Sequence, residues 1–179
     1  NEVTVKASNS TWSAKEISRI VRSKKIDVKM ITITSCDADS LLPPKYFSYL
    51  SYTFLNDPQR YLHFYWAPVL LYNNFWEVSL PIRIQATLSS IIRLSALIRP
   101  DSLIQISTYS LSLAMLERIG YWDTDMIPED WHIFLQAFFS LGSNVKTIPL
   151  YLTVTRDAVN STNLFNTLNA FFCSSLDSS

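Results

Sequence analysis

Two aspartates, Asp37 and Asp39, follow closely on a short apolar segment rich in β-branched residues, Ile31 to Thr34. That segment has the character of a buried strand. In extended backbone, residues i and i+2 point the same way, so both carboxylates can face one cation. In open α/β sheets, ligands bind outside the carboxyl ends of the strands. The pattern predicts a Mg²⁺ or Mn²⁺ site shared with a phosphate-bearing ligand, with a solvated turn as the alternative.

A second acidic pair, Glu129 and Asp130, begins a predicted helix that continues to Leu141 and stops at Gly142. Acids in the first turn of a helix are stabilised by its dipole, so a structural role alone would explain them. Together, however, the two sites meet two requirements of sugar transfer from a nucleotide-diphosphate donor. A cation neutralises the departing diphosphate, and a positioned carboxylate takes a proton from the attacking hydroxyl.

Composition excludes several classes of protein. The 179 residues contain 15 Lys+Arg and 15 Asp+Glu, giving zero formal charge and no basic run, so we expect no nucleic-acid partner. Only two glycines are present, which excludes glycine-rich phosphate loops. Two cysteines and two histidines are too few for a disulfide framework or a zinc site. The length suits one domain.

The pattern of apolar residues predicts alternating strands and helices, and therefore an α/β layered fold. We expect an ordered domain over residues 1–155 and a divergent, poorly ordered tail over residues 156–179. The expected elements are a helix ending near residue 23, strands at 31–34, 60–66, 103–107 and 145–152, and helices at 43–55, 69–98 (kinked near Pro81), 111–119 and 129–141.

One helical stripe, formed by Ile84, Leu88, Ile91 and Ile92, has two possible surroundings. The segment 81–98 does not contain an apolar run long enough to span a bilayer, because Arg83, Gln85 and Arg93 interrupt it. We expect the stripe to pack against the domain. The alternative is contact with a membrane surface.

Four segments give the chain a resemblance to the family 2 glycosyltransferases, in particular the processive, membrane-associated branch of cellulose and hyaluronan synthases. The resemblance covers roughly residues 5 to 155, with the motifs in the family's order. The matching segments are Lys6-Ala7-Ser8-Asn9, Cys36-Asp37-Ala38-Asp39-Ser40, Ser107-Thr108-Tyr109-Ser110 with Ile119-Gly120-Tyr121-Trp122-Asp123, and Pro128-Glu129-Asp130.

The resemblance implies a GT-A-like, Rossmann-like sheet that binds a nucleotide sugar, and an inverting transfer to a hydroxyl. In that family pattern, Asp37 and Asp39 hold Mg²⁺ or Mn²⁺ and the nucleotide diphosphate, Asp130 is the general base, and Glu129 lies beside the acceptor. The implied partners are a UDP-sugar donor and a glycan or lipid-linked acceptor. The implied location is the cytoplasmic side of a membrane to which the full-length protein belongs.

The remaining expected site residues each have a structural alternative. Lys6 contacts the nucleotide or is an exposed surface lysine. Thr108 and Tyr109 line the acceptor pocket or only pack. Trp131 and Trp122 stack on a sugar ring or belong to the core.

The chain also departs from the family. The family's first strand and its early nucleotide-binding Asp would lie before residue 1, and residues 156–179 contain no Gln-x-x-Arg-Trp motif. We therefore expect the catalytic middle of a larger, N-terminally incomplete enzyme. The alternatives are a non-catalytic binding or scaffold domain, an inactive fragment, or a peripheral membrane protein that uses the 81–98 stripe.

Overall fold

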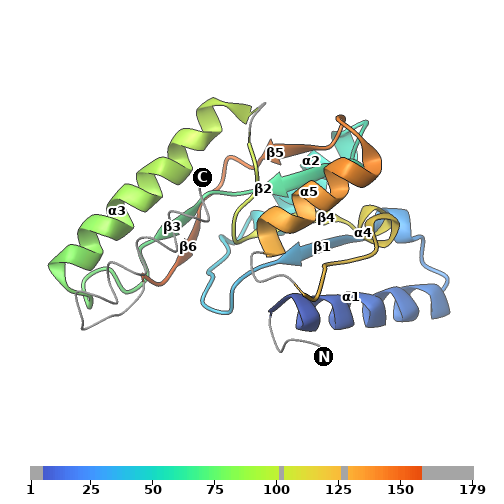
Figure 1. Cartoon of the computed structure of the whole chain (residues 1–179), viewed down its shortest axis with the longest axis horizontal. Coiled ribbons are helices and arrows are strands. Elements are labelled where there is room, and N and C mark those ends of the chain that lie inside the picture. Colours follow the sequence, from blue (N-terminus) through green and yellow to red (C-terminus); the bar gives the residue numbers. More distant parts are fainter. Residues whose placement is uncertain (1–5, 101–102, 126–128, 159–179) are drawn as a thin grey trace.

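The computed structural model describes residues 6–100, 103–125 and 129–158, and Figure 1 shows their arrangement. The helices are α1 (Lys6–Ser23), α2 (Tyr46–Asn56), α3 (Leu80–Ser95), α4 (Leu113–Ile119) and α5 (Glu129–Leu141), with short 3-10 turns η1 (Val28–Met30) and η2 (Ala96–Ile98). The strands are β1 (Thr32–Ser35), β2 (His63–Trp66), β3 (Val69–Leu71), β4 (Tyr109–Ser112), β5 (Lys146–Pro149) and β6 (Val154–Arg156).

The described strands form a mixed four-stranded sheet and a separate two-stranded sheet. In the larger sheet the order is β1-β4-β2-β5; β4 runs antiparallel to both of its neighbours, and β2 and β5 are parallel. The smaller sheet pairs β3 with β6 in parallel. The predicted α/β class with flanking helices is confirmed. Pro149 lies in an edge strand, as its missing N–H requires.

Helices cover both faces of the larger sheet because side chains alternate along its strands. On β2, Phe64 and Trp66 point into a core shared with α1, α4 and α5. Tyr65 between them points to the opposite side, where α2 packs. Figure 1 shows α5 in front of the sheet and α2 behind it.

Helix α3 packs on the small sheet through a third, minor core that includes Leu71, Ile82 and Ala86. The predicted packing of the Ile84, Leu88, Ile91 and Ile92 stripe is wrong: these four side chains are between 49% and 59% exposed. The buried residues of α3 are Ile82, Gln85 and Ala86 instead, so the helix approaches the small sheet through another face. None of the described helices is long and apolar enough to cross a bilayer.

Two predicted elements differ from the structure for local reasons. Residues 69–71 form β3 rather than helix because they pair with β6, and Pro81 lies in the first turn of α3 rather than at a kink. The strand expected at 103–107 is displaced to β4. Ser107 has a φ of 68°, a left-handed conformation that a strand does not accommodate.

Gly120 ends α4 in the left-handed conformation, with a φ of 86°, and a Cβ there would meet no atom within 4 Å. We expect Gly120→Ala to lower the free energy of unfolding by about 1 kcal/mol through backbone strain alone. Urea denaturation measures this. Gly120→Asn should lose less, because Asn tolerates this conformation. An alanine variant as stable as the parent would contradict the assignment.

Candidate active site

Ser107 joins the two acidic segments that the sequence singles out. Its backbone N–H donates to Asp130 Oδ2 at 2.7 Å, and its hydroxyl donates to Asp37 Oδ2 at 2.6 Å. The sheet explains the second bond. β1 and β4 pair with Ser35 opposite Tyr109, so Asp37 and Ser107, each two residues beyond that pair, leave the sheet at the same end. Acids 93 residues apart in the chain therefore share one bridging residue.

Lys6 adds a second connection between the two segments. It is the first residue of α1, and its Nζ lies 2.8 Å from Asp37 Oδ1 and 2.8 Å from Glu129 Oε1. The alternative of an exposed surface lysine is wrong, because the Lys6 side chain is 33% exposed and paired with both acids. Burial alone would lower the Lys6 pKa, but the charge of Asp130 and the bonds to Asp37 and Glu129 raise it above its ordinary value.

Arg156, at the end of β6, is a site residue that sequence analysis missed. Its guanidinium pairs with Asp37, its Nε lies 3.5 Å from Asp39 Oδ2, and its Nη1 lies 3.3 Å from Ser107 Oγ. The position results from pairing between Leu41 and Thr155, whose backbone groups exchange two hydrogen bonds. No pattern in the neighbouring residues predicts that pairing, and the sequence analysis placed Arg156 in the divergent tail.

The two central aspartates have pKa values shifted in opposite directions. Burial raises the pKa of Asp130 to about 7; the Lys6 charge opposes this rise, and the Glu129 charge adds to it. Burial also acts to raise the pKa of Asp37, but hydrogen bonds from Lys6 and Ser107 and the Arg156 charge bring it below its ordinary value. Asp130 Oδ1 is buried and has no hydrogen-bond partner among the described residues. One carboxylate is thus fixed and ionised, and the other is poised to exchange a proton near neutral pH.

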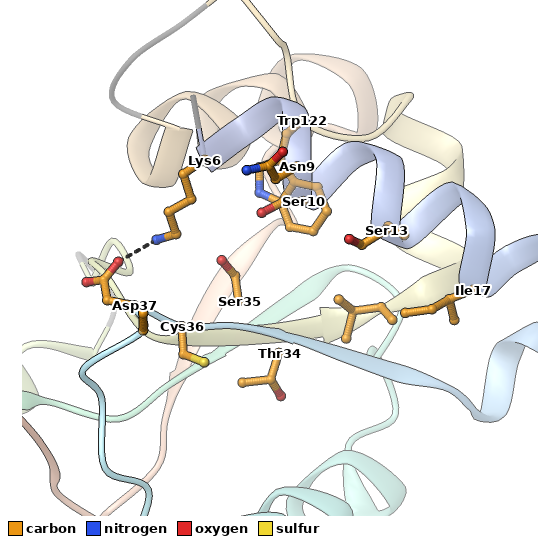
Figure 2. Close-up of a pocket in the computed structure, with 13 residues that line it drawn as sticks. Lys6, Asn9, Ser10, Ser13, Ile17, Thr34, Ser35, Cys36, Asp37 and Trp122 are labelled. Atoms are coloured by element: carbon orange, nitrogen blue, oxygen red, sulfur yellow. Dashed lines mark hydrogen bonds and ion pairs between the residues drawn. The ribbon is translucent and has the colours of Figure 1, made fainter. Parts of the chain in front are cut away.

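A cavity of about 620 Å³ opens between α1 and β1, next to the acidic cluster. Figure 2 shows Lys6 and Asp37 at one end and Trp122 near the helix. The remaining polar lining comes from Asn9, Ser10 and Ser13 on α1, from Thr34 and Ser35 on β1, and from Cys36 directly after it. Amide and hydroxyl groups beside a paired lysine and aspartate suit a polar organic ligand.

The residues expected at the acceptor are placed less favourably. Thr108 and Tyr109 are completely buried, and the Tyr109 hydroxyl accepts a 2.6 Å hydrogen bond from Trp122 Nε1 within the core. Tyr109 therefore occupies a packing position, and Trp122, which is also buried, contributes to the lining of the cavity as well. Trp131 follows Asp130 on α5 and is half-buried, with its Nε1 buried and unpartnered among described groups. Pro128 lies outside the described residues.

The carboxylates of this cluster offer few free ligand positions for a divalent cation. No group of three His, Cys, Asp or Glu side chains within residues 6–100, 103–125 and 129–158 could hold one unaided. Asp37 already accepts from Lys6, Ser107 and Arg156, which leaves about one of its four lone-pair sites. In this cluster, the Asp39 carboxylate contacts only Arg156, whose Nε lies 3.5 Å from Asp39 Oδ2. A Mg²⁺ or Mn²⁺ at these two carboxylates would therefore need further ligands, such as the phosphate oxygens with which Mg²⁺ is usually bound.

Comparisons with models of protein families, with curated proteins and with solved structures found no match to this chain.

Asp130 should make stability depend on pH. Its carboxyl titrates near 3.8 when unfolded and near 7 when folded, so the folded state binds the proton more tightly and loses stability as the pH rises between these values. Asp130→Asn cannot ionise. Its free energy of unfolding relative to the parent should therefore rise by roughly 2 to 3 kcal/mol between pH 5 and pH 8.

Urea denaturation at the two pH values measures this difference. Asp125→Asn, the same chemical change at an exposed aspartate in the preceding loop, is the control and should show no pH-dependent gain. A variant at position 130 that becomes less stable relative to the parent at pH 8 would contradict the raised pKa.

Proposed function

We propose that this chain is the catalytic part of an inverting glycosyltransferase with a GT-A-like sheet, and that it transfers a sugar from a nucleotide-diphosphate donor to a hydroxyl. The observation that carries the proposal is the bridge through Ser107 between Asp37 and Asp130. It supports one site in which Asp37, which lines the cavity, belongs to the donor end and Asp130, on the other side of Ser107, belongs to the acceptor end.

Asp130 is the proposed general base. Its pKa near 7 lets it accept a proton at neutral pH, where general bases are most effective. The Ser107 N–H holds Oδ2, whereas Oδ1 is buried and unpartnered among the described groups, so the proposed reaction requires the acceptor hydroxyl to reach this buried oxygen. As the hydroxyl oxygen bonds to the anomeric carbon, its proton passes to Asp130. The bond from that carbon to the diphosphate breaks, and its electron pair leaves on the phosphate oxygen with inversion of configuration.

The donor end combines two fixed positive charges with two carboxylates. Lys6 and Arg156 contact Asp37 and lie where they can attract a diphosphate. With Asp39 and Glu129 included, the carboxylates of this cluster outnumber its two cations. A Mg²⁺ or Mn²⁺ held through Asp37 and Asp39 would neutralise that excess and the charge of the leaving diphosphate.

The proposal includes the substrates and the cellular location of the protein. A UDP-sugar as donor and a glycan or lipid-linked molecule as acceptor follow from the family resemblance. So does membrane association of the full-length protein, with this domain on the cytoplasmic side. The polar cavity beside Lys6 and Asp37 is of a size that suits part of a nucleotide.

A non-catalytic binding or scaffold domain is the second candidate. The observation that favours it is that Asp37 is already neutralised by both Lys6 and Arg156, as in an ion network that only holds segments together.

Titration calorimetry with UDP separates these candidates. We expect a heat of binding that requires Mn²⁺, because the two carboxylates bind the cation effectively only together with phosphate oxygens. Mn²⁺ alone should bind at least about tenfold more weakly than Mn²⁺ with UDP. Asp39→Asn should abolish the metal-dependent heat, whereas Asp125→Asn should retain it. The absence of metal-dependent heat in the parent would support the scaffold.

Sugar-nucleotide turnover tests the base directly. In the protein that shows turnover, Asp130→Asn should reduce the rate by about 10² to 10⁴-fold, the usual contribution of a general base, with UDP affinity within about threefold. The parent's kcat/KM should fall below a pKa near 7, because the base must be ionised. Asp125→Asn is again the control. Turnover by the position-130 variant at the parent's rate would remove Asp130 from this role.

A further inference from the structure

The Arg156 guanidinium lies where the sequence predicts a divalent cation, between the carboxylates of Asp37 and Asp39. Its Nη1 donates to Asp37 Oδ2, and its Nε lies 3.5 Å from Asp39 Oδ2. The two carboxylates thus share one positive group, and that group belongs to the chain itself. Lys6 has a different position, because it contacts Asp37 through Oδ1 (Figure 2) and has Glu129 as its second partner.

The backbone on both sides of this contact is held in place. The Asn73 N–H donates to the Arg156 carbonyl oxygen, and the Asn73 side chain donates to the Asp39 carbonyl oxygen, both at 3.2 Å. Just after Asp39, Leu41 and Thr155 exchange two backbone hydrogen bonds, which tie this loop to β6. A cation can therefore reach both carboxylates only if the Arg156 side chain turns away. That side chain is 30% exposed, so it has solvent to turn into.

Charge and lone pairs make the guanidinium and a divalent cation mutually exclusive at this position. Like charges side by side in a half-buried cluster repel more strongly than they do in water. While Arg156 is bonded, Asp37 has about one lone-pair site left, and the departure of Arg156 frees another. The released guanidinium needs a new anion, and the phosphate oxygens of a nucleotide suit its planar donors.

We propose that Arg156 blocks the cation position in the absence of nucleotide and transfers to the diphosphate of the donor when the cation binds. The cation takes the carboxylates that the arginine leaves, and the phosphate takes the arginine. Metal and nucleotide therefore promote each other's binding. This inference rests on the proposed function and adds a mechanism that couples the metal to the donor.

Mn²⁺ binding without nucleotide tests the block. The electron paramagnetic resonance signal of the free ion measures it. Arg156→Gln should bind Mn²⁺ at least about tenfold more tightly than the parent, because the competing positive charge is gone. Arg156→Lys keeps that charge and should stay within about threefold of the parent. Adding Asp39→Asn to Arg156→Gln should remove the gain. Arg22→Gln is the matched control, since Arg22 pairs with Glu117 outside this cluster, and should bind Mn²⁺ as the parent does.

UDP binding at saturating Mn²⁺ tests the transfer to phosphate. Here Arg156→Gln should bind UDP at least about tenfold more weakly than the parent, because phosphate loses a charged hydrogen-bond donor. Titration calorimetry measures this affinity. The same substitution thus strengthens the binding of Mn²⁺ alone and weakens the binding of UDP. An arginine that only stabilised the fold would weaken both when it is replaced.

A measurement on the parent covers the case in which the glutamine variant does not fold. The Nε–H resonance of Arg156 in a ¹⁵N nuclear magnetic resonance spectrum is identified by its absence from Arg156→Lys. This resonance should shift when Mg²⁺ and UDP are added together, because the guanidinium exchanges carboxylate for phosphate. Mg²⁺ alone should shift it much less.

Three results would overturn the inference. They are Mn²⁺ binding by Arg156→Gln no tighter than the parent's, UDP binding by that variant as tight as the parent's, and an Arg156 resonance that ignores Mg²⁺ with UDP. If the parent nevertheless binds UDP only with Mn²⁺, the proposed function stands without this coupling. If the parent binds no UDP with Mn²⁺, both the coupling and the donor site of the proposed function are contradicted.

Discussion

The pairing of the Asp37 carboxylate determines how the centre of this molecule is assembled. Its side chain is only 22% exposed, and a carboxylate in that position is stable only with partners. The partners come from three other segments: Lys6 from the start of α1, Ser107 from the loop before β4, and Arg156 from the end of β6. The requirement to neutralise one charge thus fixes three chain segments around the end of β1.

The same network separates the properties of two carboxylates that lie on either side of Ser107. Asp37 receives hydrogen bonds and positive charge, which stabilise its ionised form. Asp130 is more deeply buried and has Glu129 beside it, and Lys6 compensates for this only in part. Opposite shifts of neighbouring acids are the usual physical basis for assigning one to hold charge and the other to transfer a proton. The proposed chemistry depends on this difference more than on either residue alone.

Local features of the fold were predictable because their causes are local. Residue type and spacing predicted the strand before Asp37, the acidic first turn of α5 and the glycines that end α4 and α5. The left-handed φ of Gly120 and Gly142 confirms that these glycines end their helices. The α/β class follows from the alternation of such elements. Asp37 and Asp130 were predicted as candidate site residues for the same reason.

What the sequence could not predict depends on tertiary structure. Ser107 bridges the acids because of its left-handed backbone and the register of the sheet. The residues next to Ser107 in the sequence predict neither feature. Arg156 reaches the site because β6 pairs with β3 and with Leu41. The apolar stripe of α3 has helical spacing whether it faces the core or the outside, so periodicity gave its position on the helix but not its orientation.

Nuclear magnetic resonance titration of the Asp130 side-chain carboxyl, in the parent and in Asp37→Asn, tests the central claim most directly. If the two carboxylates share one pocket, Asp130 titrates near 7 in the parent, and its pKa falls when the neighbouring negative charge is removed and Lys6 loses a competing partner. Asp57→Asn, a change at a carboxyl that pairs with His63 and Tyr65 instead, should leave that value unchanged. An Asp130 that titrates near 4, or one that does not respond to the change at position 37, would contradict the account.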